Sequence, residues 1–203
     1  MENNNDFLTN QPDSAETGRS WIYEVFDWLD AMVISVIAVV VIFTFFFRVV
    51  GIEGQSMQQT LFENDKLIIT NLGYKPKNGD IVVISRNYRN LETPYNEKLN
   101  ERPIIKRVIA TEFQTVDIDF ETGIVYVDGV PLDESEYLGS PTTSPADVKF
   151  PVTVPENHIF VLGDNRMNSK DSRDKEIGMV DERYVLGHAV FRIYPFNRIG
   201  RIK

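Results

Sequence analysis

The sequence predicts a mostly β fold that follows a single N-terminal transmembrane helix. Ala31 to Phe47 is an uncharged run of 17 residues between Asp30 and Arg48. At about 1.5 Å per residue, a helix of this length approaches what is needed to cross a bilayer. After Gly51 the pattern changes to short β-branched runs separated by turn residues. No stretch beyond residue 52 keeps a helical period, so the remainder is predicted to be β.

We interpret the apolar run as a retained anchor and place the span at residues 30–50, because Val49 and Val50 extend it. A helix in a soluble core would carry a charged face, which this run lacks. A removable secretory signal is the alternative. The run is longer than the apolar part of such a signal, its N-terminal flank is acidic, and no small-x-small cleavage site follows.

The residues before the span form two predicted segments. Residues 1–20 are polar with few apolar anchors and predict a disordered tail. Ser20 to Asp30 spaces its aromatic residues helically, with acids between them, and is expected to lead into the span along the membrane surface. Together they form a first region at residues 1–29.

Five short apolar runs and one hairpin give the predicted strands. Ile124 to Val127 meets Asp128-Gly129, which is a strong two-residue hairpin signal. The segments 86–102 and 133–155 are polar and predict surface insertions. The other strands are expected at 66–70, 80–84, 103–109, 158–162 and 189–194.

Composition excludes several classes of function. The net charge of −9 is concentrated before residue 48, with seven acids and one base there, and no basic stripe argues for nucleic acid. The absence of cysteine excludes thiol chemistry and disulfides. His158 and His188, both at expected strand starts, have no acid at a spacing that suggests a triad or a zinc site. Neither a metal nor a cofactor is expected.

Two residues carry the expected chemistry. Ser56, in Gly54-Gln55-Ser56-Met57, follows the apolar run by only a few residues. Lys106 lies within the apolar, strand-like run 104–108. A lysine that apolar neighbours desolvate can act as the base that a serine nucleophile needs. Taken alone, Ser56 would be a turn serine and Lys106 an exposed residue of an edge strand.

A third motif is the most specific feature of the chain. Residues 163–173 read Gly-Asp-Asn-Arg-Met-Asn-Ser-Lys-Asp-Ser-Arg. A polar turn would explain none of this order. Together with Ser56 and Lys106, over roughly residues 20–200, it resembles the bacterial type I signal peptidases, which are membrane-anchored Ser/Lys proteases that cut signal peptides from exported proteins.

The resemblance implies an antiparallel β catalytic domain at residues 51–203, with a smaller β subdomain inserted at about 111–160. It also implies a cytoplasmic N-terminus, a single pass through the cell membrane and an extracellular domain. The charge pattern argues poorly for this orientation, because Arg19 is the only basic residue before the span. The implied partners are preprotein signal peptides and the lipid bilayer.

Roles for individual residues follow from the same resemblance. Ser56 is the nucleophile, its backbone N–H holds the oxyanion, and Lys106 is the base. Ser169 would hold the lysine amine by a hydrogen bond. Asp171 would pair with Arg173 and with Arg107, while residues 164–166 brace the loop. Shallow pockets for small substrate side chains are expected from Ile52, Met57, Leu61, Ile104 and Ile105.

The chain departs from the family pattern at three places. Gln59 stands where the pattern Ser-Met-x-Pro-Thr-Leu has proline, which loses a rigid φ near the nucleophile. Gly54 stands where some members have a serine that donates to the oxyanion. Residues 110–114 replace the pattern Gly-Leu-Pro-Gly-Asp after the lysine.

Two alternative functions remain at this point. Self-cleaving repressors use a similar dyad, but the anchor and the lack of a DNA-binding region count against them. A catalytically idle relative could serve as a membrane-anchored chaperone or assembly factor. Retention of Ser56, Lys106 and Ser169 together argues against that.

Overall fold

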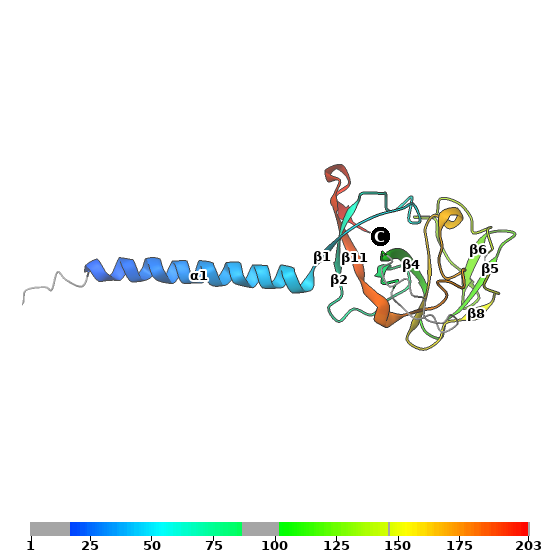
Figure 1. The fold of residues 1–203 in the computed structure, drawn as a ribbon, viewed down its shortest axis with the longest axis horizontal. Helices are drawn as coiled ribbons and strands as arrows, with labels where there is room; N and C mark the ends of the chain where they lie inside the picture. The colour runs from blue at the N-terminus through cyan, green and yellow to red at the C-terminus, as the bar shows by residue number, and fades with distance from the viewer. Residues whose placement is uncertain (1–16, 87–101, 146, 203) are drawn as a thin grey trace, which may run out of the picture. The chain divides into compact units, whose positions relative to one another are not determined.

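The computed structural model describes residues 17–86, 102–145 and 147–202. It divides the chain into two compact units, with the boundary between Phe45 and Phe46. Most of the tail predicted at residues 1–20 and of the insertion predicted at 86–102 lies outside the described residues. The fold class is confirmed: one apolar N-terminal helix precedes a domain of antiparallel sheets (Figure 1).

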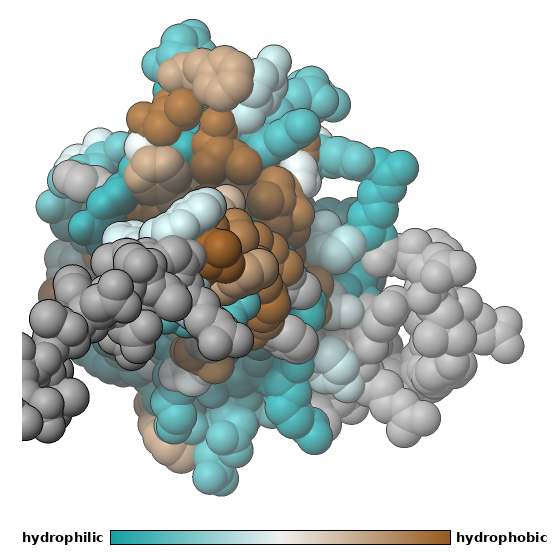
Figure 2. All heavy atoms as spheres, turned by 90° about the vertical axis from the view of Figure 1, so that its left-hand side faces the viewer, coloured by the Kyte–Doolittle hydropathy of each residue, from teal (hydrophilic) through white to brown (hydrophobic). Residues whose placement is uncertain are grey.

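The N-terminal unit is helix α1, which runs without a break over Thr17–Phe46. Its stretch Trp21–Ile42 has a mean hydropathy of 2.3 and is not buried, so it is long and apolar enough to cross a membrane. Its large hydrophobic side chains between Trp21 and Ile42 are exposed, and hydrophobic residues are visible in Figure 2, which views the molecule from its N-terminal side. The segment expected along the membrane surface is continuous with the apolar stretch.

The predicted C-terminal end of the span, residue 50, is wrong. The helix ends at Phe46, and strand β1 (Arg48–Gly51) follows at once. Val49 and Val50 lie opposite Ile68 and Leu67 in an antiparallel pair, so hydrogen bonds of a sheet replace those of a helix here.

The larger sheet of the second unit has eight strands in the order β1-β2-β11-β3-β4-β9-β10, with β12 beside β11. All its strand pairs are antiparallel. Its remaining strands are β2 (Lys66–Thr70), β3 (Ile81–Ile84), β4 (Ile104–Ala110), β9 (His158–Leu162), β10 (Val180–Asp181), β11 (Val185–Tyr194) and β12 (Gly200–Arg201).

A smaller four-stranded sheet has the order β7-β6-β5-β8. Figure 1 shows β5, β6 and β8 at the opposite end of the second unit from β1 and β2. This sheet lies within the region where an inserted subdomain is predicted. Its strands are β5 (Thr115–Asp119), β6 (Ile124–Val127), β7 (Val130–Pro131) and β8 (Val152–Thr153).

Three short 3₁₀ turns, η1 (Arg166–Asn168), η2 (Glu182–Tyr184) and η3 (Phe196–Arg198), are the other helical elements described.

Strands β3 and β9 lie inside the larger sheet and contribute buried residues on both of their faces. Every residue of β3 is buried, with Ile81 and Val83 in one apolar cluster and Val82 and Ile84 in another. Strand β9 likewise divides its residues between the second cluster and a third, which includes β5 and β6. Because alternate residues of a strand face opposite sides, these two strands join the three clusters into one core.

The strands predicted from the sequence are confirmed within one or a few residues, and so is the hairpin at Asp128-Gly129. Both turn residues have positive φ, 52° and 78°, as a two-residue hairpin turn requires. The placement of His188 at a strand start is wrong, because β11 begins three residues earlier, at Val185. His188 faces an acid across the sheet, with Nε2 3.7 Å from Asp80 Oδ1.

Candidate active site

Ser56 lies in a compact turn over residues 55–61, which follows β1 and is called the Ser56 turn below. The turn is closed by backbone hydrogen bonds from Gln58 N to Gln55 O (3.1 Å) and from Leu61 N to Met57 O (2.8 Å). The side chains of Met57 and Leu61 are buried in the core and anchor the turn. Ser56 itself is only partly buried, so its hydroxyl is presented from a fixed backbone.

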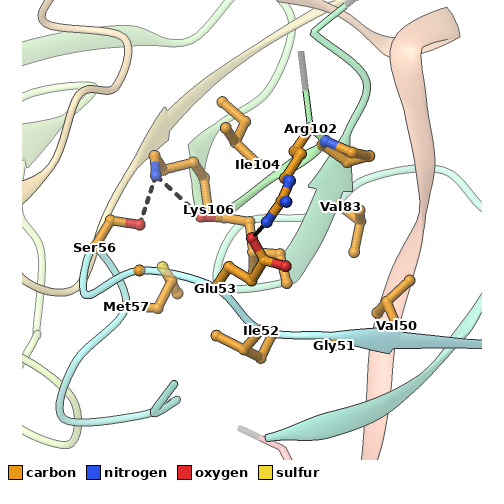
Figure 3. Close-up of a pocket in the computed structure, with 13 residues that line it drawn as sticks. Val50, Gly51, Ile52, Glu53, Ser56, Met57, Val83, Arg102, Ile104 and Lys106 are labelled. Atoms are coloured by element: carbon orange, nitrogen blue, oxygen red, sulfur yellow. Dashed lines mark hydrogen bonds and ion pairs between the residues drawn. The ribbon is translucent and has the colours of Figure 1, made fainter. Parts of the chain in front are cut away.

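Lys106 reaches this hydroxyl from β4. Its position opposite Val82 in the central strand β3 places it well inside the sheet, and the residue is only 3 % exposed. Nζ donates to Ser56 Oγ at 2.7 Å and to the carbonyl of Ile105 at 3.1 Å (Figure 3). The structure thus brings together two residues that are 50 positions apart in the sequence.

Burial changes the acidity of the lysine. It lowers the pKa of Lys106 from 10.5 to about 8, because an ammonium group loses hydration inside the protein. The positive charges of Arg86 and Arg173 act in the same direction, while the negative charges of Asp171 and Asp164 oppose it. A sizeable fraction of the amine is therefore neutral near pH 8, as a general base requires.

Arg107, the next residue on β4, forms a separate buried network. Its Nε and Nη2 each donate to the carboxylate of Asp164 at 2.8 Å, and Nη1 donates to the carbonyl of Gly79 at 2.8 Å. Thr60 Oγ1 donates to the same carboxylate at 2.5 Å. Asp164 thereby connects β4 to the end of the Ser56 turn. It is the bidentate partner of Arg107, a position that the resemblance gave to Asp171.

The segment 163–173 contacts the Ser56 turn through hydrogen bonds from Asn165. The backbone N–H of Asn165 donates to the carbonyl of Ser56 at 3.0 Å, and its side-chain amide donates to the carbonyl of Gln55 at 3.1 Å. A Cβ added to Gly163 would overlap Ser169 Oγ and lie 2.5 Å from the Ser56 carbonyl oxygen. Only glycine permits this close approach.

Asp171 and Arg173 pair within the loop. Nε and Nη2 of Arg173 donate to the two carboxylate oxygens at 2.8 and 3.0 Å, and both residues are buried. Asp171 also accepts from the backbone N–H of Gly163 at 3.1 Å. The pair therefore holds Gly163, the glycine that packs against the Ser56 turn.

The expected hydrogen bond between Ser169 and the lysine amine is absent from the structure. Ser169 Oγ is buried and has no hydrogen-bond partner among the described residues. The hydroxyl lies against Gly163, beside the Ser56 carbonyl, while Nζ of Lys106 turns to Ser56 Oγ and to its neighbouring carbonyl. The Ser169 hydroxyl is thus close to the backbone of Ser56 but has no hydrogen-bond partner among the described residues.

Arg166 has partners that the sequence did not indicate. Its guanidinium pairs with Glu134 and donates to Thr142 Oγ1, and Nε donates to the carbonyl of Gly163 at 3.0 Å. Glu134 and Thr142 are buried, at 7 % and 0 % exposure. The interpretation of residues 133–155 as a surface insertion is therefore wrong for these two residues, and also at its C-terminal end, where Val152–Thr153 forms β8 and Val154 is buried in the core. The acidic run Asp-Glu-Ser-Glu resembles a solvated loop and gave no signal of a buried partner.

A cavity of about 240 Å³ opens beside the dyad. Four of the five predicted pocket residues line it. Leu61 does not, because it is fully buried in the core beneath the turn. The lining residues are Val50, Gly51, Ile52, Glu53, Gly54, Ser56, Met57, Val83, Arg102, Pro103, Ile104, Ile105 and Lys106.

Comparison with known proteins identifies the family of the chain. The model of the signal peptidase family, peptidase S26, matches residues 25–194. The chain belongs to this family. A probable signal peptidase I-1 of Synechocystis is 38 % identical over 74 % of this chain and 73 % of its own, and signal peptidase I of Bacillus licheniformis is 31 % identical over 87 % and 92 %. A signal peptidase I structure from Enterococcus faecalis covers 57 % of this chain and 97 % of its own at 28 % identity, with a TM-score of 0.39.

Membership confirms the family prediction and makes the chain a serine peptidase, a hydrolase.

The structure shows what changes where Gln59 replaces the proline of the family pattern. This residue has φ 100°, and its side chain lies against Gly139, where an added Cβ would come within 2.7 Å of Gln59 Cγ. A proline ring holds φ near −65°. The turn of this chain is therefore shaped differently from one that proline would fix, and is not merely less rigid.

Proposed function

We propose that the chain is a membrane-anchored Ser/Lys endopeptidase that cleaves the signal peptides of exported preproteins after small residues. The observation that carries the proposal is the 2.7 Å contact between Lys106 Nζ and Ser56 Oγ, made by an amine that is almost completely buried. A nucleophile within hydrogen-bond reach of a base whose pKa is lowered is the arrangement that covalent catalysis needs.

The first half of the reaction forms an acyl-enzyme. Neutral Lys106 accepts the proton of the Ser56 hydroxyl as Oγ attacks the carbonyl carbon of the scissile bond. The negative charge that develops on the carbonyl oxygen is stabilised by the backbone N–H of Ser56. The ammonium form of Lys106 then donates its proton to the leaving amine, and the C–N bond breaks.

The second half releases the signal peptide. Lys106, neutral again, takes a proton from a water molecule that attacks the ester, and returns it to Ser56 Oγ. A second donor to the oxyanion is not expected from residue 54. Gly54 has φ 87°, a conformation in which a serine would be strained. The backbone of the turn is left to supply the donors in this chain.

The size of the cavity supports a preference for small side chains. At about 240 Å³ it is smaller than most ligand pockets, and Ile52, Met57 and Ile105 form apolar walls close to Ser56. A peptide laid in it would place small residues, such as alanine at one and three positions before the cut, against these walls. Larger side chains would meet packed core residues.

Helix α1 supports the anchor, and we propose that its N-terminus is cytoplasmic and that the second unit is extracellular. The absence of cysteine allows a direct test. Ser20→Cys and Ser135→Cys would be labelled separately in intact cells with a membrane-impermeant maleimide. Labelling of the exposed residue 135 alone supports this topology, and labelling of residue 20 alone reverses it.

Cleavage of a preprotein tests the activity itself. The wild-type chain, purified in detergent, should release the mature protein with a new N-terminus after a small residue. Ser56→Ala should not. Ser135→Ala, which removes an exposed hydroxyl outside the cavity, should cleave like the wild type. Equal processing by the wild type and by Ser56→Ala would contradict the role of Ser56 as the nucleophile. No processing by either would favour a catalytically idle chaperone or assembly factor.

A further inference from the structure

Two charged residues face each other across the cavity beside the dyad. Glu53 comes from the segment that leads to Ser56, and Arg102 from the segment that leads into β4 and Lys106. Their side chains form an ion pair, so that the two walls of the cavity are connected at this point (Figure 3).

This pair differs in kind from the rest of the lining. Both side chains are largely exposed, at 64 % for Glu53 and 78 % for Arg102, so they lie at the mouth and not on the floor. Lys106 is the other ionisable lining residue, and it is buried beside Ser56. The apolar floor can select a substrate side chain by size, but it cannot select by charge.

An exposed ion pair is easily exchanged for another. Such pairs contribute little to stability because both partners are well hydrated when separate. A charged substrate side chain that reaches the mouth can therefore replace one partner at small cost. A lysine or arginine would bind Glu53, and a glutamate or aspartate would bind Arg102.

We propose that Glu53 and Arg102 are a specificity-determining pair. They select substrates by the charge of one side chain, which belongs to a residue on the N-terminal side of the cleaved bond and lies over the cavity mouth. The proposal rests on the proposed endopeptidase function. With both residues present, the site accepts either sign. With one removed, the other should select substrates of opposite charge.

The expected results are opposite shifts in selectivity. Glu53→Gln should lower kcat/KM for a lysine-containing peptide relative to its glutamate counterpart about two- to fivefold, the size of an exposed ion pair. Arg102→Gln should shift the same ratio by a similar factor in the other direction. The double variant should return the ratio to near its wild-type value, and raising the salt concentration should reduce each shift.

The experiment uses the full chain in detergent with a set of signal-peptide substrates. Alanine is kept at the first and third residues before the cleavage site. Lysine, glutamine or glutamate is placed at the second, fourth or fifth residue before it. Arg183→Gln is the matched control, since Arg183 is 82 % exposed in an ion pair with Asp181 and lies outside the cavity. Thermal unfolding of each variant checks that the exposed substitutions leave the fold intact.

Opposite shifts at one substrate position support the proposal. Cleavage of every peptide with an unchanged lysine-to-glutamate ratio in both single variants overturns it, and leaves the endopeptidase function standing. A shift of equal size in Arg183→Gln also overturns it, because the effect would then come from net charge. Failure of the wild type to cleave any peptide would instead refute the endopeptidase function, and this proposal with it.

Discussion

The backbone N–H of Asn165 donates a 3.0 Å hydrogen bond to the carbonyl oxygen of Ser56, so the loop 163–173 contacts the peptide group of Ser56 itself. Gly163 packs against the same carbonyl, and Asp164 binds Thr60 at the end of the turn. Small displacements of this loop should therefore move Ser56 Oγ relative to Lys106 Nζ. Displacements of about 1 Å can lower a rate by orders of magnitude.

Gly163→Ala should lower kcat at least about tenfold, because the new methyl group would push the Ser56 carbonyl or Ser169 out of place. Preprotein cleavage under saturating substrate measures this. Gly200→Ala is the control, since a Cβ there meets no atom within 4 Å and its φ is not positive. Equal rates for Gly163→Ala and the control would mean that the loop does not position the nucleophile.

The pH profile should show one rising limb. With the pKa of Lys106 lowered to about 8, the neutral base accumulates as pH rises, so kcat/KM should increase about tenfold per pH unit below pH 8 and level off above it. Lys106→Arg should abolish cleavage, since a guanidinium group does not give up its proton. A flat profile between pH 6 and 9, or activity in the arginine variant, would exclude Lys106 as the base.

The same lysine should destabilise the fold at neutral pH. The pKa of Lys106 is about 8 in the folded state and 10.5, the ordinary value, in the unfolded state. Below pH 8 both states are protonated, and burial of the charge costs about 3 kcal/mol of unfolding free energy. Between pH 8 and 10.5 the unfolded state binds more protons than the folded state, so stability rises with pH and the cost disappears.

Lys106→Met should therefore unfold at higher temperature than the wild type at pH 7, with a gain of up to about 3 kcal/mol that narrows as pH rises from 8 to 10.5. Thermal unfolding in detergent at several pH values measures the difference. A constant difference over this range would show that the charge of the lysine does not cause it.

Restoring the family's proline should damage this chain. Gln59→Pro cannot keep φ 100° and should lower the unfolding free energy by roughly 2–3 kcal/mol, together with the cleavage rate. Gln59→Gly, which adopts this φ without strain, should stay within about 1 kcal/mol of the wild type. Equal stability of the proline and glycine variants would show that the turn can rearrange freely.

The sequence was sufficient for local features and for the resemblance, and it was insufficient where distant residues meet. The apolar helix, the hairpin at Asp128-Gly129 and the strand around Lys106 each have a pattern that a short window reveals. The burial of Lys106 depends on its place beside the fully buried β3, which no local pattern shows. Val49 and Val50 were misassigned because an apolar helix and an apolar strand look alike over four residues.

Glu134 is another residue whose role depends on a distant partner, because Arg166 is 32 positions away in the sequence. Glu134→Gln would leave the guanidinium of Arg166 buried without its carboxylate, which should cost about 3–5 kcal/mol of unfolding free energy. The cleavage rate should also fall, because Arg166 holds the Gly163 carbonyl. Glu136→Gln, an exposed change two residues further on, should alter neither stability nor rate. Unfolding and preprotein cleavage measured on both variants decide the matter: if Glu134→Gln matches Glu136→Gln in both, the buried pair does not brace the site.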